Sequence, residues 1–275
     1  LPIKEATKLG YTFLGWYKGE EKVEAIAAGT LGDVELEAKW QINEYTIAFE
    51  ENGGTDVENI TKAYDTDVTA PANPTKKGHN FVHWYEQGSE DTAYVFNKMP
   101  LGGVTLYAKW DAIEYTININ ANGGTNEDGS AIESIAQDYG TAVTAPADPV
   151  KEGHTFNGWY VVGTETKYTF PETMPDENVN IEAKWTINPY DVIFYNYDGK
   201  EYNKTSPDFG TAIAAPAGEP VREHYTFVGW SLTNDTTDDE TETPIDFATA
   251  NLTVTVGGNK FYPIFKRVPV TLELI

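Results

Sequence analysis

Apolar and polar side chains alternate along several short segments of this chain. Residues 45–50 read Tyr-Thr-Ile-Ala-Phe-Glu, and residues 34–40 read Val-Glu-Leu-Glu-Ala-Lys-Trp. Residues 179–185 repeat the second pattern as Val-Asn-Ile-Glu-Ala-Lys-Trp. A period of two places the apolar side chains on one face of a β-strand and the polar ones on the other. The pattern therefore predicts short strands with one buried face.

Glycine and proline interrupt these segments. Asn52–Gly54 and Asn122–Gly124 both read Asn-Gly-Gly, which supplies the positive φ that tight turns require. Residues 69–74 and 144–149 each contain two prolines, which lack the N–H that a central strand donates. We expect both segments to be crossovers, followed by a short helical turn such as one through residues 76–78. The predicted fold class is α+β, predominantly β.

Every tryptophan lies at one of two repeated positions. The first is the centre of a Gly-Trp-Tyr signature, relaxed to His-Trp-Tyr and Gly-Trp-Ser in two copies, and the second closes an Ala-Lys-Trp signature. The first-position residues are Trp16, Trp84, Trp159 and Trp230, and the second-position residues are Trp40, Trp110, Trp185 and, in the last copy, Phe265. Such self-similarity at a fixed period predicts a tandem array of small modules.

The spacing of the signatures predicts the domain boundaries. Residues 1–40 match only the second half of a repeat, so the opening strands are missing and a sheet edge should be left unpaired. Three complete repeats follow, at residues 41–110, 111–185 and 186–267, and the last carries the acidic insert Asn234–Glu242. Residues 268–275 alternate again and predict a terminal strand or the start of a next module.

The segments between repeats are short. Four residues separate each closing tryptophan from the next opening tyrosine, at residues 41–44, 111–114 and 186–189. A domain of about 60–70 residues buries only about 60% of its chain surface and is marginally stable by itself. Packing between neighbours, as in solenoid proteins, would stabilise it. We therefore expect adjacent repeats to be partners within an elongated rod.

Three motifs together carry a family resemblance. They are Gly-Tyr-Thr-Phe-Leu-Gly-Trp-Tyr at 10–17, Val-Thr-Leu-Tyr-Ala-Lys-Trp at 104–110 and Ala-Asn-Gly-Gly-Thr at 121–125. In their combination and spacing the chain resembles tandem Listeria–Bacteroides repeats, the group that includes the internalin B-repeat. The resemblance covers residues 1 to about 267.

The resemblance implies a β-grasp-like unit, a small mixed sheet with one short helix. It also implies an extracellular protein of the bacterial cell surface or cell wall, with the repeats serving as a stalk or as an adhesin region. It brings no catalytic or cofactor residues. The last repeat departs from the pattern, with Asp198-Gly199 in place of Asn-Gly-Gly and Phe265 in place of tryptophan.

Composition narrows the function classes. Of 275 residues, 43 are acidic and 19 basic, for a net charge of −24. Such a polyanion repels nucleic acid and anionic membrane surfaces. No apolar run reaches the roughly 18 residues that a membrane span needs, so no membrane insertion is expected. The chain has no cysteine, which excludes disulfides, thiolate metal sites and a cysteine nucleophile. Because Leu1 is not an initiator methionine, we expect a fragment or a processed product.

Few residues could carry chemistry. His79 and His154 share the position of Tyr11 and Tyr225, so we expect them to fill an aromatic niche. His79 and His83 would lie about 13 Å apart on a strand, too far to share one metal ion. The acidic insert offers weak calcium ligands, because hard cations prefer clustered carboxylates. These are Asp235, Asp238, Asp239 and Glu240; a solvated loop is the alternative.

The tryptophans allow two interpretations. Their rings could be platforms for a sugar, or they could belong to the core. Strand alternation puts the closing tryptophans on the apolar face. It puts Trp16 and its counterparts on the face opposite Phe13 and its counterparts, so one of these two sets should be partly exposed.

No phosphate loop, Ser/His/Asp set or carboxylate pair recurs between repeats, so we expect no enzyme and no cofactor. The main hypothesis is a rigid extracellular stalk or spacer. The alternative is an adhesive module that binds a host glycan, mucin or matrix protein.

Overall fold

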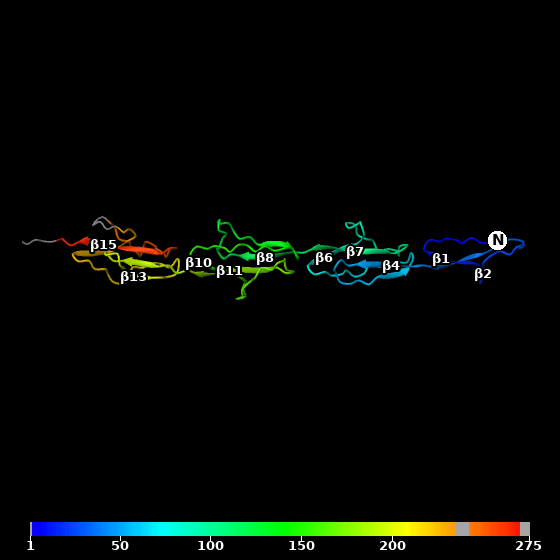
Figure 1. Cartoon of the computed structure of the whole chain (residues 1–275), viewed down its shortest axis with the longest axis horizontal. Helices are drawn as coiled ribbons and strands as arrows, with labels where there is room; N and C mark the ends of the chain where they lie inside the picture. The colour runs from blue at the N-terminus through cyan, green and yellow to red at the C-terminus, as the bar shows by residue number, and fades with distance from the viewer. Residues whose placement is uncertain (1, 235–241, 270–275) are drawn as a thin grey trace, which may run out of the picture. The chain divides into compact units, whose positions relative to one another are not determined.

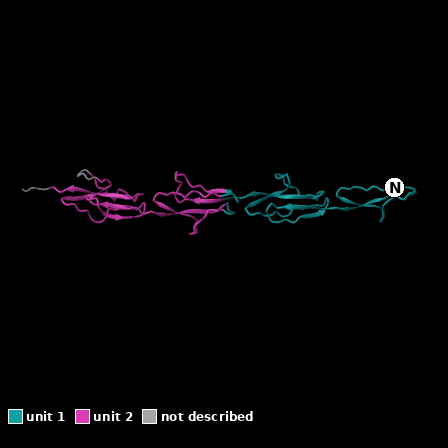
Figure 2. Cartoon of the chain, in the orientation of Figure 1, with its two compact units in different colours: residues 1–115, 137–142, 173–177 teal, residues 116–136, 143–172, 178–275 magenta. Residues whose placement is uncertain are grey.

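A computed structural model describes residues 2–234 and 242–269. These residues divide into two compact units, each of which gathers segments that are not contiguous in sequence (Figure 2). The first comprises residues 1–115, 137–142 and 173–177, and the second comprises residues 116–136, 143–172 and 178–275.

The part of the chain that the structure describes is all β (Figure 1). The predicted α component is wrong. In place of a helical turn at residues 76–78, the chain makes one tight turn in which the His79 N–H donates to the carbonyl of Lys76 at 3.1 Å. Gly78 adopts a φ of +67°, which turns the chain directly into the next strand. A residue in the left-handed region stops a right-handed helix before it can begin.

The strands form one sheet of three and three sheets of four, with the orders β2-β1-β3, β5-β4-β7-β6, β10-β11-β8-β9 and β13-β12-β15-β14. Their bounds are β1 (Tyr11–Lys18), β2 (Glu21–Val23), β3 (Glu37–Ile42), β4 (Glu44–Glu50), β5 (Ile60–Ala63), β6 (His79–Glu86), β7 (Val104–Ala112), β8 (Glu114–Asn120), β9 (Ile135–Asp138), β10 (His154–Val161), β11 (Val179–Ile187), β12 (Val192–Tyr195), β13 (Glu201–Thr205), β14 (Tyr225–Ser231) and β15 (Asn259–Arg267).

The predicted small mixed sheet is present in each complete repeat. Its first and last strands lie side by side and run parallel, as β4 and β7 do over the pairs from Ile47↔Val104 to Glu50↔Tyr107. Antiparallel hairpins flank this central pair on both sides. The proline-rich crossover at residues 69–74 is not strand, as predicted.

One β-bulge decides where the first-position tryptophans point. In β6 the register slips between Phe81 and His83, so that Val82 is an extra residue in the ladder. The same slip occurs in β1, β10 and β14. It breaks the period of two, and Phe81 and Trp84 therefore face the same side, with ring centroids 5.4 Å apart. The prediction that these two residues lie on opposite faces is wrong.

The core of each complete repeat lies on that shared face. In residues 41–110 it includes Ile47, Met99 and Leu106, each with at most 1% of its surface exposed. Trp84 is 4% exposed and its ring packs against Phe49 at 4.7 Å. In residues 186–267 an equivalent cluster includes the corresponding tryptophan and two stacked phenylalanines, Phe194 and Phe261.

The Asn-Gly-Gly turn and the closing tryptophan hold each other. The Trp110 indole N–H donates to the Glu51 carbonyl at 2.8 Å, and the Asn52 amide donates to the Ala108 carbonyl at 2.8 Å. Asn52 and Gly53 take positive φ, as predicted for this turn. A Cβ on Gly54 would lie 2.5 Å from the Trp110 ring, so only glycine fits there. We call this arrangement the tryptophan clasp.

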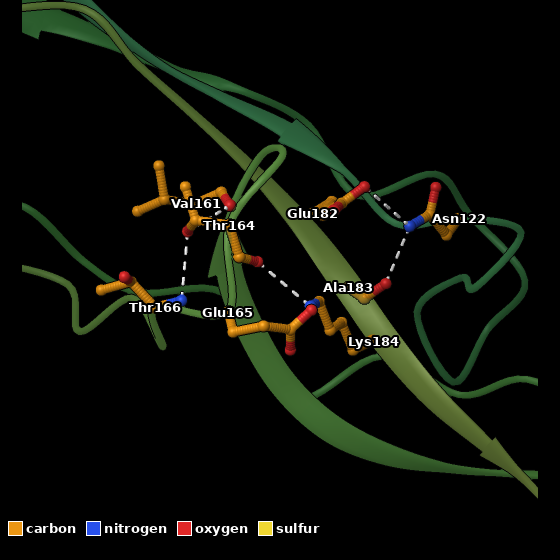
Figure 3. Close-up of polar contacts among 8 residues, drawn as sticks. All are labelled: Asn122, Val161, Thr164, Glu165, Thr166, Glu182, Ala183 and Lys184. Atoms are coloured by element: carbon orange, nitrogen blue, oxygen red, sulfur yellow. Dashed lines mark hydrogen bonds and ion pairs between the residues drawn. The ribbon is translucent and has the colours of Figure 1, made fainter.

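The next repeat has the same clasp. The Trp185 indole N–H donates to the Ala121 carbonyl at 3.1 Å. Figure 3 shows the second bond, in which the Asn122 amide donates to the Ala183 carbonyl at 2.8 Å. In the last repeat the Phe265 side chain has no N–H to donate, and its ring instead makes a T-shaped contact with the Tyr197 ring, with the centroids 6.3 Å apart. The motif departures in that repeat thus occur together because they change the two sides of one contact.

Gly124→Ala should destabilise the repeat at residues 111–185. The new Cβ would meet the Trp185 ring at 2.4 Å, and such overpacking costs about 1–3 kcal/mol. We expect the urea midpoint of that repeat to fall, as followed by tryptophan fluorescence. The same change in a Trp185→Phe background should cost less, because phenylalanine lacks the two ring carbons that clash. An equal cost in both backgrounds would show that the clasp is not the cause.

Candidate functional site

One contact that recurs outside the cores lies where one repeat meets the next. In unit 1, Gly78 lies directly under the Tyr139 ring, and a Cβ at Gly78 would be 2.1 Å from it. Gly10 and Tyr64 make the same contact at 2.0 Å. In unit 2, Gly153 lies under Phe209 at 2.1 Å. We call these residues the junction glycines and the junction aromatics.

Two backbone hydrogen bonds accompany each of these contacts. The Ile113 N–H donates to the Gly78 carbonyl at 2.9 Å, and the Ile113 carbonyl accepts from the Tyr139 N–H at 2.9 Å. Asn43 makes the equivalent bonds in the first junction at 2.9 and 2.8 Å, and Asn188 makes them in the third at 2.9 and 2.9 Å. The linker residue is therefore fixed by both of its polar backbone groups.

The two histidines predicted to fill an aromatic niche do so. The His79 ring meets the Tyr139 ring edge to face at 5.8 Å, and the His154 ring meets Phe209 at 6.1 Å. The Nδ1 atom of His79 lies 2.8 Å from the Lys77 carbonyl. His83 points elsewhere, with Nε2 at 3.1 Å from the Glu90 carbonyl. Aromatic rings and backbone carbonyls are the partners expected of histidines that have a packing role.

The last repeat changes the junction glycine to His224. Its φ is +67°, close to that of the three junction glycines, and its carbonyl accepts from Val268 at 2.9 Å. The backbone conformation of the junction is therefore kept. The other junctions have a glycine at this position, on which an aromatic ring lies, whereas here a side chain is present. An aromatic ring cannot lie on His224 as Tyr139 lies on Gly78.

The lysine of each Ala-Lys-Trp signature lies on the polar face, as predicted. Lys184 pairs with Glu165 at 2.7 Å and donates to the Thr164 carbonyl at 3.1 Å (Figure 3). Lys39 pairs with Glu20 at 2.9 Å, and this hydrogen bond raises the pKa of Lys39. These carboxylates are almost fully exposed, and exposed ion pairs contribute little. The lysines therefore contact exposed loops without contributing much to stability.

The remaining pKa changes have structural causes. Burial raises the pKa of Tyr94, with a smaller contribution from Glu86, and burial raises the pKa of Tyr168. A hydrogen bond from Lys204, and a second from Ser206, lower the pKa of the Asp191 carboxyl. Burial and structural ion pairs shift pKa values as catalytic sites do, so these changes do not by themselves indicate acid–base chemistry.

The tryptophans differ in their exposure. Trp84, Trp159 and Trp230 are 3–5% exposed and lie in their cores. The other four tryptophans are only partly buried, as is Phe265. They are Trp16, Trp40, Trp110 and Trp185. Trp16 is the only first-position tryptophan that is not buried, and its indole N–H donates to the Lys4 carbonyl at 2.8 Å.

The calcium candidates Asp235, Asp238, Asp239 and Glu240 lie outside the described residues. Among residues 2–234 and 242–269, no three His, Asp or Glu side chains form a group that could hold a metal ion. No helix long and apolar enough to cross a membrane occurs in this part of the chain.

Sequence reasoning did not identify the junction contact. Its signal was nonetheless present. A glycine precedes Tyr11, His79 and His154, and an aromatic residue recurs at Tyr64, Tyr139 and Phe209. The pairing of each glycine with an aromatic residue became clear only from the structure.

The chain is similar in sequence to several known proteins. The chain is 36% identical over 255 residues to a protein of Evansella cellulosilytica whose name describes a membrane protein, covering 87% of the chain and 37% of that protein. A glycine-rich protein of the same organism, also named for a membrane, is 35% identical over 81% of the chain and 26% of its own length. Internalin H of Listeria monocytogenes is 30% identical over 52% of the chain and 25% of its own length.

The chain thus spans about a quarter to just over a third of these relatives. The model of the Listeria–Bacteroides repeat domain matches it four times, at residues 1–39, 45–109, 115–184 and 190–255. These matches cover most of the sequence and confirm the resemblance that its motifs indicated. The chain belongs to the Listeria–Bacteroides repeat family.

Proposed function

We propose that this region is a non-catalytic stalk or spacer in a bacterial cell-surface protein. The observation that carries the proposal is the thrice-repeated junction, in which a bare glycine receives an aromatic ring and both polar groups of the linker residue are bonded. Such contacts restrict the hinge between neighbouring modules. A spacer needs that restriction and needs no ligand.

Charge and context support the same role. A net charge of −24 keeps the array soluble and favours extension through self-repulsion. Two relatives are named for a membrane and a third is an internalin. We propose an extracellular location at the cell surface or cell wall for this chain as well.

The alternative function, an adhesive module for a host glycan or surface protein, is favoured by one feature. The last repeat differs from its neighbours on its polar face, where Tyr195 and Tyr262 stack at 5.2 Å with an interplanar angle of 11°. In the same repeat Ser231 replaces the usual tyrosine and donates to Glu242, which also accepts from Thr233 at 2.7 Å. A spacer would not require one distinct copy, whereas an adhesin concentrates its binding residues.

Gly153→Ala should loosen the third junction. The new Cβ would overlap the Phe209 ring, so the ring must leave the glycine. Spin labels at Glu165 and Lys200, both highly exposed, would report the spread of distances across the junction. We expect the distribution to broaden clearly relative to the unsubstituted chain.

Gly163→Ala is the matched control for this experiment. Gly163 has a φ of +74° against +69° for Gly153, so alanine causes similar backbone strain, but it has open space around it. Equal broadening in the two variants, or none in either, would count against a stiff junction.

A binding panel tests the adhesive alternative. The intact chain is presented to immobilised glycans, mucins and matrix proteins, with and without millimolar calcium. The spacer role predicts no saturable binding and the same melting temperature in calcium and magnesium. Saturable binding that is lost on deleting residues 234–242, or on changing Tyr262 to alanine, would establish the adhesive function instead.

A further inference from the structure

The first and last strands of each complete repeat are hydrogen-bonded neighbours that run parallel. They are β4 with β7, β8 with β11, and β12 with β15. The chain enters a repeat at the start of the first strand and leaves at the end of the last. Tension along the chain therefore pulls the two strands in opposite directions along their own length.

This loading is shear. To slide β4 past β7, the hydrogen bonds along the four pairs from Ile47↔Val104 to Glu50↔Tyr107 must break together. Ile47 and Leu106 also leave the core in the same step, since both are fully buried. In a peeled hairpin the bonds break one after another, and each carries the load alone. Forced unfolding is governed by the unfolding barrier, which is higher when many contacts are lost at once.

Side chains strengthen the same pair of strands. The Thr116 N–H in β8 donates to Oδ1 of Asn178, the residue before β11, at 2.8 Å, and Asn118 Nδ2 donates across the pair to Asn180 Oδ1 at 3.0 Å. The tryptophan clasp adds two bonds from the turn after β8 to the end of β11. The recurring Asn-Gly-Gly and Ala-Lys-Trp motifs thus connect the first and last strands of the repeat.

Residues 1–40 provide a natural contrast. Among the residues that the structure describes, β3 pairs with β1 only, in an antiparallel register from Tyr11↔Ile42 to Tyr17↔Glu37. This sheet therefore has no parallel pair of strands that tension along the chain could shear.

We propose that the paired terminal strands form a mechanical clamp, so that each complete repeat resists tension applied along the chain. The tryptophan clasp reinforces this clamp in the repeats at residues 41–110 and 111–185. The inference goes beyond a spacer role, since a spacer need only be stiff. It applies equally if the array is adhesive, and its test does not depend on which function is right.

Single-molecule stretching of the whole chain, held at its two ends, measures this resistance. We expect residues 1–40 to extend first at low force. Three high-force ruptures should follow, each releasing roughly 65–80 residues at about 3.6 Å per residue. The three steps should differ in length, because the three repeats do, and each rupture is thereby assigned to its repeat.

A second pulling direction is the decisive control. Asn80 and Asp111 are exposed cross-strand partners at one end of β6 and β7. Because the chain has no cysteine, Asn80→Cys and Asp111→Cys provide unique attachment points. Force applied there peels the hairpin of the same repeat, and we expect rupture at a several-fold lower force. Equal forces in the two directions would overturn the proposal, because the resistance would then reflect stability alone.

Ala48→Pro tests the strand pair itself. The Thr46 carbonyl lies against Gly103 at the start of β7, so by alternation the Ala48 backbone also faces β7. Proline there removes an N–H from the ladder. We expect one of the three end-to-end ruptures to weaken or vanish, with the other two unchanged as internal controls. Three unchanged ruptures would contradict the clamp, and if the variant repeat does not fold, the two pulling directions of the unsubstituted chain still decide.

Discussion

Each complete repeat depends on the pairing of its first strand with its last. A unit of this size has too little core to be stable unless the two ends of its sequence meet. Parallel pairing of β4 with β7 brings Ile47 and Leu106 into one apolar layer with Met99 from the intervening loop. The chain between β4 and β7 also supplies the two edge strands, β5 and β6, and the segment that joins these is irregular and contains two prolines where parallel strands usually have a helix. The prolines limit its freedom in the unfolded chain, which offsets part of the cost of ordering it.

The closing tryptophan connects this pairing to the turn that follows the first strand. Its indole N–H donates to the carbonyl of Glu51 in one repeat and of Ala121 in the next. Its ring covers a glycine that no other residue could replace. The Asn-Gly-Gly and Ala-Lys-Trp motifs are far apart in sequence but are two halves of one contact. This explains why both change together in the last repeat, where Phe265 and Tyr197 make a different, purely apolar contact.

The sequence predicted the strands, turns and repeats because each depends on local alternation and on glycine. The prediction was wrong where one extra residue in a strand changes which face the later side chains occupy. The bulge after Phe81 reverses the face of every later side chain in the strand, and no local signal separates an extra residue from a regular one. The helical turn predicted at residues 76–78 was wrong because Gly78 adopts a positive φ, which belongs to a tight turn into β6. The junction contact could have been predicted in part, since the glycine and the aromatic both recur, but their pairing is a tertiary property.

The same glycine therefore has two roles in the array. Gly78 turns the chain into β6, and its missing side chain leaves the surface on which Tyr139 lies. The role of β6 in the sheet and the junction to the following repeat thus cannot vary independently, because one substitution at Gly78 affects both. His224 shows what happens when only the backbone requirement is kept: the left-handed turn persists and the hydrogen bond to Val268 is made, but the surface for an aromatic ring is lost. Since a non-glycine residue in this conformation costs about 1–2 kcal/mol, the histidine has no advantage for the turn. The His224 side chain is instead exposed to solvent, and its Nε2 atom lies 3.5 Å from a carboxylate oxygen of Glu223.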